Sequence, residues 1–299
     1  MKLATTTGDF SAYTPHVTEA MEYIAKAGFK YIDYNFCVDH RNGTGIYSDD
    51  ANHLEKVLKK ADELGVELVQ SHAPFSMFMF EGDTTPLLND TLKCVESCAR
   101  LGIKTLVVHT GYAHFLSKEQ TYQKNKEFFA PVLEAAEKHN IYILAENFNK
   151  MFAENTYWID NASDLCEFID YVNHPLLKAV WDTGHGNLQD MPQHEELKIL
   201  GSRVMALHVQ DNPGDDDKHM APFFGSLNVD SLMQGLLDIG YNGCFTFEAS
   251  NILSPAQNRR TFDDGTRLLK APLDLRIKAE NLLYEIGKTV LTTYNCFEE

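Results

Sequence analysis

Short apolar segments recur along the whole chain and alternate with segments of helical pattern. Most are rich in Val, Ile, Leu and Phe and are apolar on both faces, which is typical of strands in a parallel sheet buried on both sides. The expected strands are residues 2–7, 31–36, 66–73, 105–111, 141–148, 176–184, 203–211 and 243–250. This alternation of strand and helix predicts an α/β fold with a parallel sheet.

The segments between these strands carry helix signals. Residues 18–28 repeat apolar side chains at helical spacing and end at Gly28, a residue type that readily closes a helix. Further helical patterns span residues 50–65, 89–102, 126–140, 228–243 and 274–291. No Gly-rich phosphate loop follows the first strand, so we expect no nucleotide cofactor. The count of eight strands favours a (β/α)8 TIM barrel over an open doubly wound sheet, with residues 1–299 forming a single domain.

The composition narrows the class of partner. Acidic residues number 43 against 26 basic ones, a formal net charge of −17, and such an excess repels nucleic acid at long range. No window approaches 18 consecutive apolar residues, and the first residues lack the apolar stretch of a signal peptide, so we expect no membrane span. The six cysteines show no metal-type spacing, which favours a reduced, cytoplasmic setting.

Several expected strands end on a histidine or a carboxylate. These side chains are His72, His109, Glu146, Asp182, His208 and Glu248. The carboxyl ends of all strands in a TIM barrel open at one mouth, so the six side chains would form one ring. Because side chains alternate along a strand, Glu146 and Leu144 should both point to the barrel axis. The same alternation pairs His208 with Ala206.

Converging carboxylates predict a cation. Buried carboxylates without one would repel each other and would need protons or a metal. Carboxylate and imidazole groups together are ligands of Mn²⁺, Mg²⁺, Co²⁺ or Zn²⁺. The alternative is that each residue is a hydrogen-bonded polar group at the start of a loop. That explanation suits one isolated residue better than six on different strands, so the sequence predicts a site for a divalent metal ion.

The segments "ILAENF", "VWDTGHGN", "LHVQDN" and "FTFEAS" resemble, in this order, the xylose-isomerase-like TIM-barrel superfamily. The resemblance covers most of the chain. The superfamily includes ketose 3-epimerases, hydroxypyruvate isomerase, inosose-processing enzymes and endonuclease-IV-type AP endonucleases. In its sugar epimerase branch the matching positions hold one divalent metal ion, which implies Glu146, Asp182, His208 and Glu248 as its ligands here. The resemblance also implies that His185 contacts the substrate.

The resemblance further implies a metal-dependent sugar isomerase or epimerase that works through a metal-stabilised enediolate. Glu146 and Glu248 would lie on opposite sides of the substrate carbon, one removing a proton and the other returning it. The substrate would be a ketose, a polyol or a sugar phosphate, and Arg259 and Arg260 are candidates for binding a phosphate. A metal-dependent dehydratase of keto-polyols is an alternative on the same scaffold.

The AP endonuclease branch is the second alternative, because it builds a three-zinc cluster from further ligands. His72, His109 and His185 stand at matching places, and "DKH" supplies Asp217 and His219 as possible extra metal ligands. Against a nuclease stand the net charge of −17 and an acidic loop over residues 210–225, since contacts from Lys and Arg dominate DNA affinity. We therefore expect nucleic acid to be no partner, and His72 and His109 to bind sugar hydroxyls or a metal-bound water.

A non-catalytic sugar-binding barrel is the third alternative. It is disfavoured because both glutamates that would carry protons are intact. Aromatic groups at residues 75–80 and 222–224 follow the third and seventh strands, where they could form an apolar lid or contribute to the core or a subunit interface. Similar barrels are commonly dimers or tetramers, which favours a homo-oligomer by analogy alone.

Overall fold

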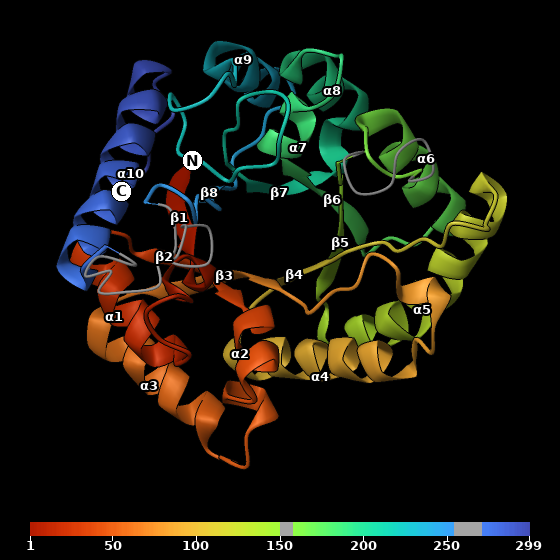
Figure 1. Cartoon of the computed structure of the whole chain (residues 1–299), viewed down its shortest axis with the longest axis horizontal. Coiled ribbons are helices and arrows are strands. Elements are labelled where there is room, and N and C mark those ends of the chain that lie inside the picture. The colour runs from red at the N-terminus through yellow and green to blue at the C-terminus, as the bar shows by residue number, and fades with distance from the viewer. Residues whose placement is uncertain (150–157, 254–270) are drawn as a thin grey trace, which may run out of the picture.

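Eight parallel strands form a nearly closed barrel with helices around its outside (Figure 1). The computed structural model describes residues 1–149, 158–253 and 271–299, so Arg259 and Arg260 lie outside the described residues. The strands are β1 (Lys2–Thr6), β2 (Tyr31–Asn35), β3 (Glu67–His72), β4 (Thr105–Val108), β5 (Tyr142–Glu146), β6 (Leu177–Asp182), β7 (Val204–His208) and β8 (Cys244–Phe247). Their order is β7-β6-β5-β4-β3-β2-β1-β8, and the predicted TIM barrel is confirmed.

The predicted helical segments are all helices. They are α1 (Val17–Ala27), α3 (His53–Leu64), α4 (Thr85–Leu101), α5 (Lys118–His139), α9 (Val229–Asp238) and α10 (Leu273–Thr293). The start of α5 was expected too late, because Ser117 and Gln120 form a capping box that begins the helix at Lys118. Gly28 ends α1 with φ of 106°, as its left-handed role requires.

Shorter helices were not predicted. The α-helices are α2 (Phe36–Asn42), α6 (Ala162–Val172), α7 (Thr183–Asn187) and α8 (Gln193–Leu200), and the 3-10 helices are η1 (Thr7–Phe10), η2 (Gly45–Tyr47), η3 (Met79–Glu81) and η5 (Gly201–Arg203). Most of these helices are too short for an amphipathic repeat to stand out from the sequence. Among the described helices, none has the length and apolar character needed to cross a membrane.

The core has two parts, one on each side of the strands. Val107, Leu144, Val180 and Ala206 pack together inside the barrel. A larger cluster, which includes Ile143, Ala145, Leu207 and Val209, lies on the other side of the strands together with the helices. Leu144 and Ala206 therefore face the axis, as the alternation predicted, and Glu146 and His208 follow them on the same side.

The barrel closes between β7 and β8. In the described part of the chain these strands meet at a single bridge between Val209 and Phe247. Val209 N donates to Thr246 O at 2.7 Å and Glu248 N donates to Val209 O at 3.1 Å. We call this contact the β7–β8 seam. His208 precedes it on one side and Glu248 follows it on the other.

Candidate metal centre

The carboxyl ends of β5 to β8 bring four side chains together. Ligand atoms of Glu146, Asp182, His208 and Glu248 all lie within 4.8 Å of one another. His208 Nδ1 is 3.0 Å from Glu146 Oε1 and 3.5 Å from Glu248 Oε2. Glu146, Asp182 and His208 are at most 1% exposed, whereas Glu248 is half-buried and reaches the solvent side. Three carboxylates and one imidazole suit a divalent cation.

Unsatisfied oxygens at this centre also fit a cation. Asp182 Oδ2 and Glu146 Oε2 are buried and receive no well-aligned hydrogen bond from the described residues, although His109 Nε2 lies 2.9 Å from the latter. A buried carboxylate oxygen without a partner is costly. A divalent cation would satisfy both oxygens, so the residues present fit the metal ion that the sequence predicts.

Electrostatics at the centre favour added positive charge. Burial alone raises the pKa of Glu146, but the His208 and His109 imidazoles outweigh it and lower that pKa well below its usual value. Burial lowers the pKa of His208, yet the Glu146 and Glu248 carboxylates raise it well above the ordinary value. Burial raises the pKa of Asp182 to about 7. His208 and Asp182 therefore hold protons more tightly than usual, and a cation that binds these side chains would displace the protons.

Two side-chain amides hold Asp182, and sequence reasoning missed both. Gln210 Nε2 donates to Asp182 Oδ1 at 3.1 Å and to Asp217 Oδ1 at 2.9 Å. Asn147 Oδ1 accepts from Asp182 N at 2.7 Å. Gln210 could have been found, because it stands two residues after His208 and so shares its side of the extended chain. Gly184 leaves room for this amide, since a Cβ there would lie 2.1 Å from the Gln210 side chain.

His185 belongs to a second cluster at the same mouth. The strand expected over residues 176–184 ends at Asp182, and helix α7 follows it, because Asp182 Oδ1 caps this helix by accepting from His185 N at 2.7 Å. The His185 ring lies with Nε2 3.1 Å from Asp217 Oδ2. Ligand atoms of His185, Asp217 and His219 lie within 4.8 Å of one another. Although burial opposes it, His185 holds the pKa of Asp217 well below its usual range.

His72 and His109 form a third group, on the β3 and β4 side. Their Nε2 atoms are 3.0 Å apart, and they lie 3.5 Å and 2.9 Å from Glu146 Oε2. Ligand atoms of His72, Glu146 and His208 also lie within 4.8 Å of one another. The Phe75 ring stacks on His109 with centroids 4.2 Å apart. The structure therefore brings to one mouth all the predicted metal-binding and substrate-binding residues except Arg259 and Arg260, which lie outside the described residues.

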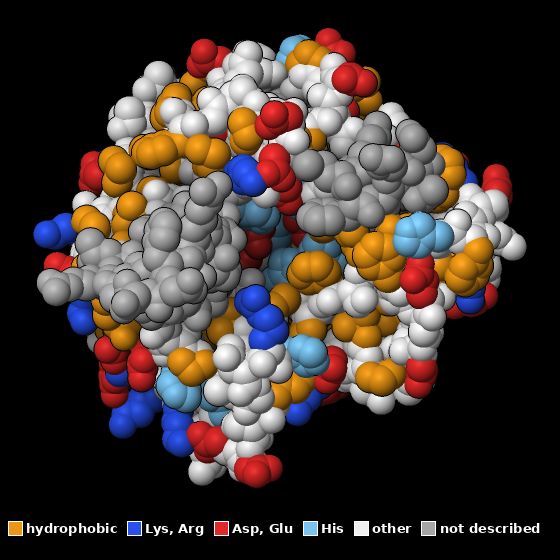
Figure 2. Space-filling model, in the orientation of Figure 1, with side chains coloured by type: hydrophobic (Ala, Val, Ile, Leu, Met, Phe, Trp, Pro, Cys, Tyr) orange, Lys and Arg blue, Asp and Glu red, His pale blue; other side chains and the backbone are white. Residues whose placement is uncertain are grey.

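A cavity of about 400 Å³ contains most of these groups. Figure 2 shows a hollow at the centre of this face, where histidine and acidic side chains gather. The apolar part of the lining is Phe75, Met77 and Phe148. Two of these belong to the aromatic group expected near the mouth at residues 75–80. Phe223 and Phe224 of the other group are exposed.

Relatives of this chain include sugar epimerases. An uncharacterised protein of Methanocaldococcus jannaschii is 24% identical over 275 residues, which are 88% of this chain and 89% of that protein. Fructoselysine 3-epimerase of Escherichia coli O157:H7 is 31% identical over 88 residues, which are 29% of this chain and 32% of the epimerase.

Solved structures share the fold. A D-tagatose 3-epimerase-like protein superposes with a TM-score of 0.76 at 23% identity, covering 99% of this chain and 98% of that one. An AP endonuclease of family 2 from Brucella melitensis superposes with a TM-score of 0.68 at 18% identity, covering 83% and 93%. The family model described as xylose isomerase-like TIM barrel matches residues 21–271, which is most of the chain. This chain therefore belongs to the xylose isomerase-like TIM barrel family.

Proposed function

We propose that this protein is a metal-dependent sugar isomerase or epimerase that moves a proton at a carbon next to a carbonyl. The observation that carries the proposal is the placement of Glu146 and Glu248 in one cavity, with Asp182 and His208 within 4.8 Å of both. The fructoselysine 3-epimerase among the relatives and the tagatose 3-epimerase-like structure support the same class of reaction.

The four side chains of the first cluster would hold one divalent metal ion. When bound there, the ion would act as a Lewis acid on the substrate carbonyl and so acidify the neighbouring C–H group. Mn²⁺, Mg²⁺, Co²⁺ and Zn²⁺ all accept this donor set. Gln210 and Asn147 keep the Asp182 carboxylate and backbone in place for that role.

Two glutamates would carry the proton. Glu146 ends β5 and Glu248 follows β8, so their carboxylates approach the cavity from different parts of the barrel wall. One removes the proton and the other returns it, and return to the opposite face of the same carbon inverts the centre. Phe75 and Phe148 limit the access of water to the resulting carbanion.

Three histidines would position the sugar. His72, His109 and His185 line the same cavity. His185 Nδ1 lies 2.9 Å from Asn147 O, which fixes the ring, and Nε2 would bind a sugar hydroxyl in exchange for its contact with Asp217 Oδ2. We assign substrate binding to these three side chains.

The experiment is deuterium exchange from D₂O into a panel of ketoses, followed by NMR. We expect incorporation at the carbon next to the carbonyl, and the identity of the product separates epimerase, isomerase and dehydratase. Glu146→Gln and Glu248→Gln should each lower the exchange rate by about 10²–10⁴-fold. Glu134→Gln, which changes an exposed glutamate on α5, is the matched control. Absence of exchange across the panel, or full activity in either cavity variant, would contradict the proposal.

A second candidate function is phosphodiester hydrolysis by a centre of three metal ions. It is favoured by the two further clusters, His72–Glu146–His208 and His185–Asp217–His219. They add His72, His185, Asp217 and His219 as ligands that the single-metal reaction does not require. The net charge of −17 disfavours DNA as the substrate. Elemental analysis of purified protein decides between the two. About one ion per chain supports the sugar reaction. Three zinc ions per chain, together with cleavage of abasic DNA, would reject the sugar reaction in favour of phosphodiester hydrolysis.

A further inference from the structure

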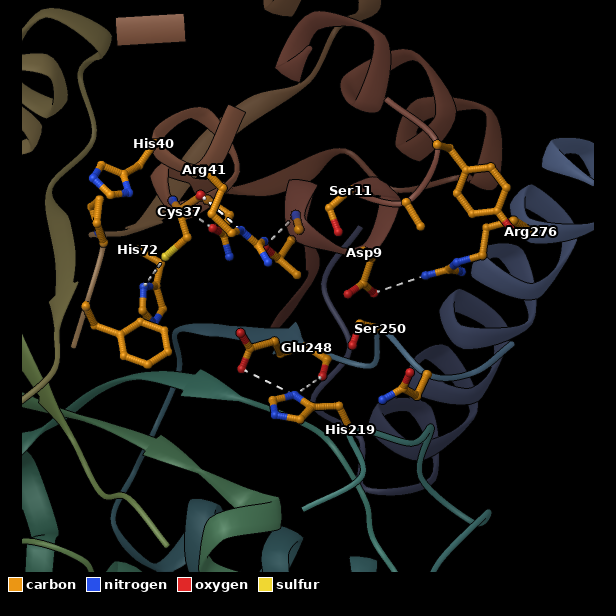
Figure 3. Close-up of a pocket in the computed structure, with 18 of the residues that line it drawn as sticks. Asp9, Ser11, Cys37, His40, Arg41, His72, His219, Glu248, Ser250 and Arg276 are labelled. Atoms are coloured by element: carbon orange, nitrogen blue, oxygen red, sulfur yellow. Dashed lines mark hydrogen bonds and ion pairs between the residues drawn. The ribbon is translucent and has the colours of Figure 1, made fainter. Parts of the chain in front are cut away.

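A second cavity, also of about 400 Å³, opens beside the metal centre (Figure 3). The two cavities share His72, Phe75, His219 and Glu248 as lining residues, so a ligand could extend from one into the other. Asp9 and Arg276 form a wall of the second cavity (Figure 3). Neither of them takes part in the proposed proton transfer.

Asp9 places a carboxylate without a hydrogen bond at this wall. It lies in η1, directly after β1, and its side chain is 0% exposed. Neither of its oxygens accepts a hydrogen bond from the described residues, and the cation beside it, Arg276 Nη2, is 3.4 Å from Oδ2. Burying a carboxylate with so little compensation is expensive unless a partner arrives.

Arg276 donates a hydrogen bond to Glu280, and among the described residues it donates none to Asp9. Its Nη1 donates to Glu280 Oε2 at 2.7 Å, and Thr5 Oγ1 donates to Glu280 Oε1 at 2.6 Å. Its Nη2 donates no hydrogen bond to the described residues. The buried group of Asp9, Glu280 and Arg276 thus has two carboxylates against one guanidinium. This surplus of negative charge favours a ligand group that donates hydrogen bonds and carries no negative charge.

A proton is one partner that can offset this surplus of negative charge, and a ligand group that donates a hydrogen bond would take the place of that proton. Burial, together with the Glu280 carboxylate, raises the pKa of Asp9 well above its usual value in spite of Arg276. The lining of the second cavity also includes the polar side chains of Ser11, Asn35 and Ser250. Each cavity alone falls within the roughly 300–1,000 Å³ typical of small-molecule sites. Once a sugar occupies the metal side, the second cavity retains room for another unit.

We propose that the substrate is a ketose that carries a further unit, and that this unit lies in the second cavity and donates a hydrogen bond from a hydroxyl or ammonium group to Asp9. The inference rests on the proposed function and names its substrate class. Arg41, exposed at the rim of the same cavity, is the side chain that a phosphate group could use instead. A phosphorylated ketose therefore belongs among the test substrates.

The test compares kcat/KM for four substrates, which are a free ketohexose, a glycosyl-substituted ketose, an aminoalkyl-substituted ketose and a ketose phosphate. We expect kcat/KM for the glycosyl or the aminoalkyl ketose to exceed that for the free sugar at least tenfold. We expect the ketose phosphate to show no such advantage in kcat/KM. Asp9→Asn should reduce the advantage at least tenfold, because the amide is a weaker acceptor than the carboxylate. Asp49→Asn, at an exposed site, is the matched control and should keep the advantage.

A second variant covers the case in which Asp9→Asn does not fold, as judged by its thermal unfolding. Ser11→Leu fills the second cavity from another side and leaves the Asp9–Arg276 contact intact, and it should also remove the advantage of the substituted ketose. Two results would overturn the inference but leave the proposed function standing. In the first, the free ketose exchanges deuterium but a glycosyl or aminoalkyl substituent does not raise kcat/KM. In the second, the ketose phosphate has the highest kcat/KM. Absence of exchange with every substrate would reject the proposed function, and the inference with it.

Discussion

The Gln210 amide connects two carboxylates, and its removal tests whether it positions a metal ligand. The substitution Gln210→Leu keeps the approximate size of the side chain but deletes the donor to Asp182 and Asp217. A hydrogen bond to a charged group contributes about 1.5–3 kcal/mol. Loss of such a partner behind a metal ligand typically weakens metal affinity by about 10–100-fold. That range corresponds to roughly 1.4–2.7 kcal/mol of binding free energy.

The assay is a calorimetric titration of Mn²⁺ or Zn²⁺ into metal-free protein. Gln210→Leu should bind about 10–100-fold more weakly than the wild type. Gln234→Leu is the matched control, because Gln234 Nε2 also donates to a carboxylate, Asp238 Oδ1 at 2.7 Å, but on the exposed side of α9. Gly184→Ala should weaken binding as well, since its Cβ would displace the Gln210 amide.

A wild-type affinity in Gln210→Leu would refute this reasoning, provided that Asp182→Asn abolishes binding in the same assay. The metal ligand would then hold its position without the amide. An equal loss in Gln234→Leu would show that the effect reports general destabilisation instead. Thermal unfolding of each metal-free variant separates a folding defect from a loss of affinity.

Three further outcomes are expected. Burial raises the pKa of Asp39 to about 6, above the usual 3.8, so the folded state holds this proton more tightly and stability falls as pH rises from about 4 to 6. Between pH 5 and 7.5 the fall is about 1 kcal/mol from this group, and urea unfolding of Asp39→Asn should lack it; an unchanged pH dependence would count against the assignment. Trp181→Ala should cost about 3–5 kcal/mol of unfolding free energy, because Trp181 is fully buried and donates to Gln193 Oε1 at 2.8 Å; a loss below about 1 kcal/mol would contradict this packing. Chelation should lower the melting temperature, since a ligand at 100 times its Kd stabilises by about 2.7 kcal/mol; an unaltered melting temperature would speak against a bound ion.

The barrel and the ring of site residues follow from local patterns, and so the sequence predicts them. Glu146 and His208 were placed correctly because strand ends share one mouth and side chains alternate along a strand. Helix α7 was missed because its two glycines lower helix propensity, and the cap from Asp182 compensates for them.

Contacts between distant segments lie beyond such patterns. Asp9 and Arg276 meet because α10 packs beside α1 and β1. The residues around each of them in the sequence carry no pattern that predicts this contact. The role of Gln210 also depends on tertiary structure, since an irregular loop brings Asp217 to its side-chain amide. Pattern reading finds residues that a strand places, whereas these partners depend on tertiary packing.

The β7–β8 seam has a consequence for how tightly the barrel stays shut. Two backbone hydrogen bonds around Val209 join its edges, while His208 and Glu248 stand on either side of it. An ion coordinated by both of those side chains would cross-link β7 and β8, because the two strands could not separate without breaking its coordination. Amide protons of Val209 and Glu248 should accordingly exchange with solvent more slowly in ion-loaded protein than in stripped protein.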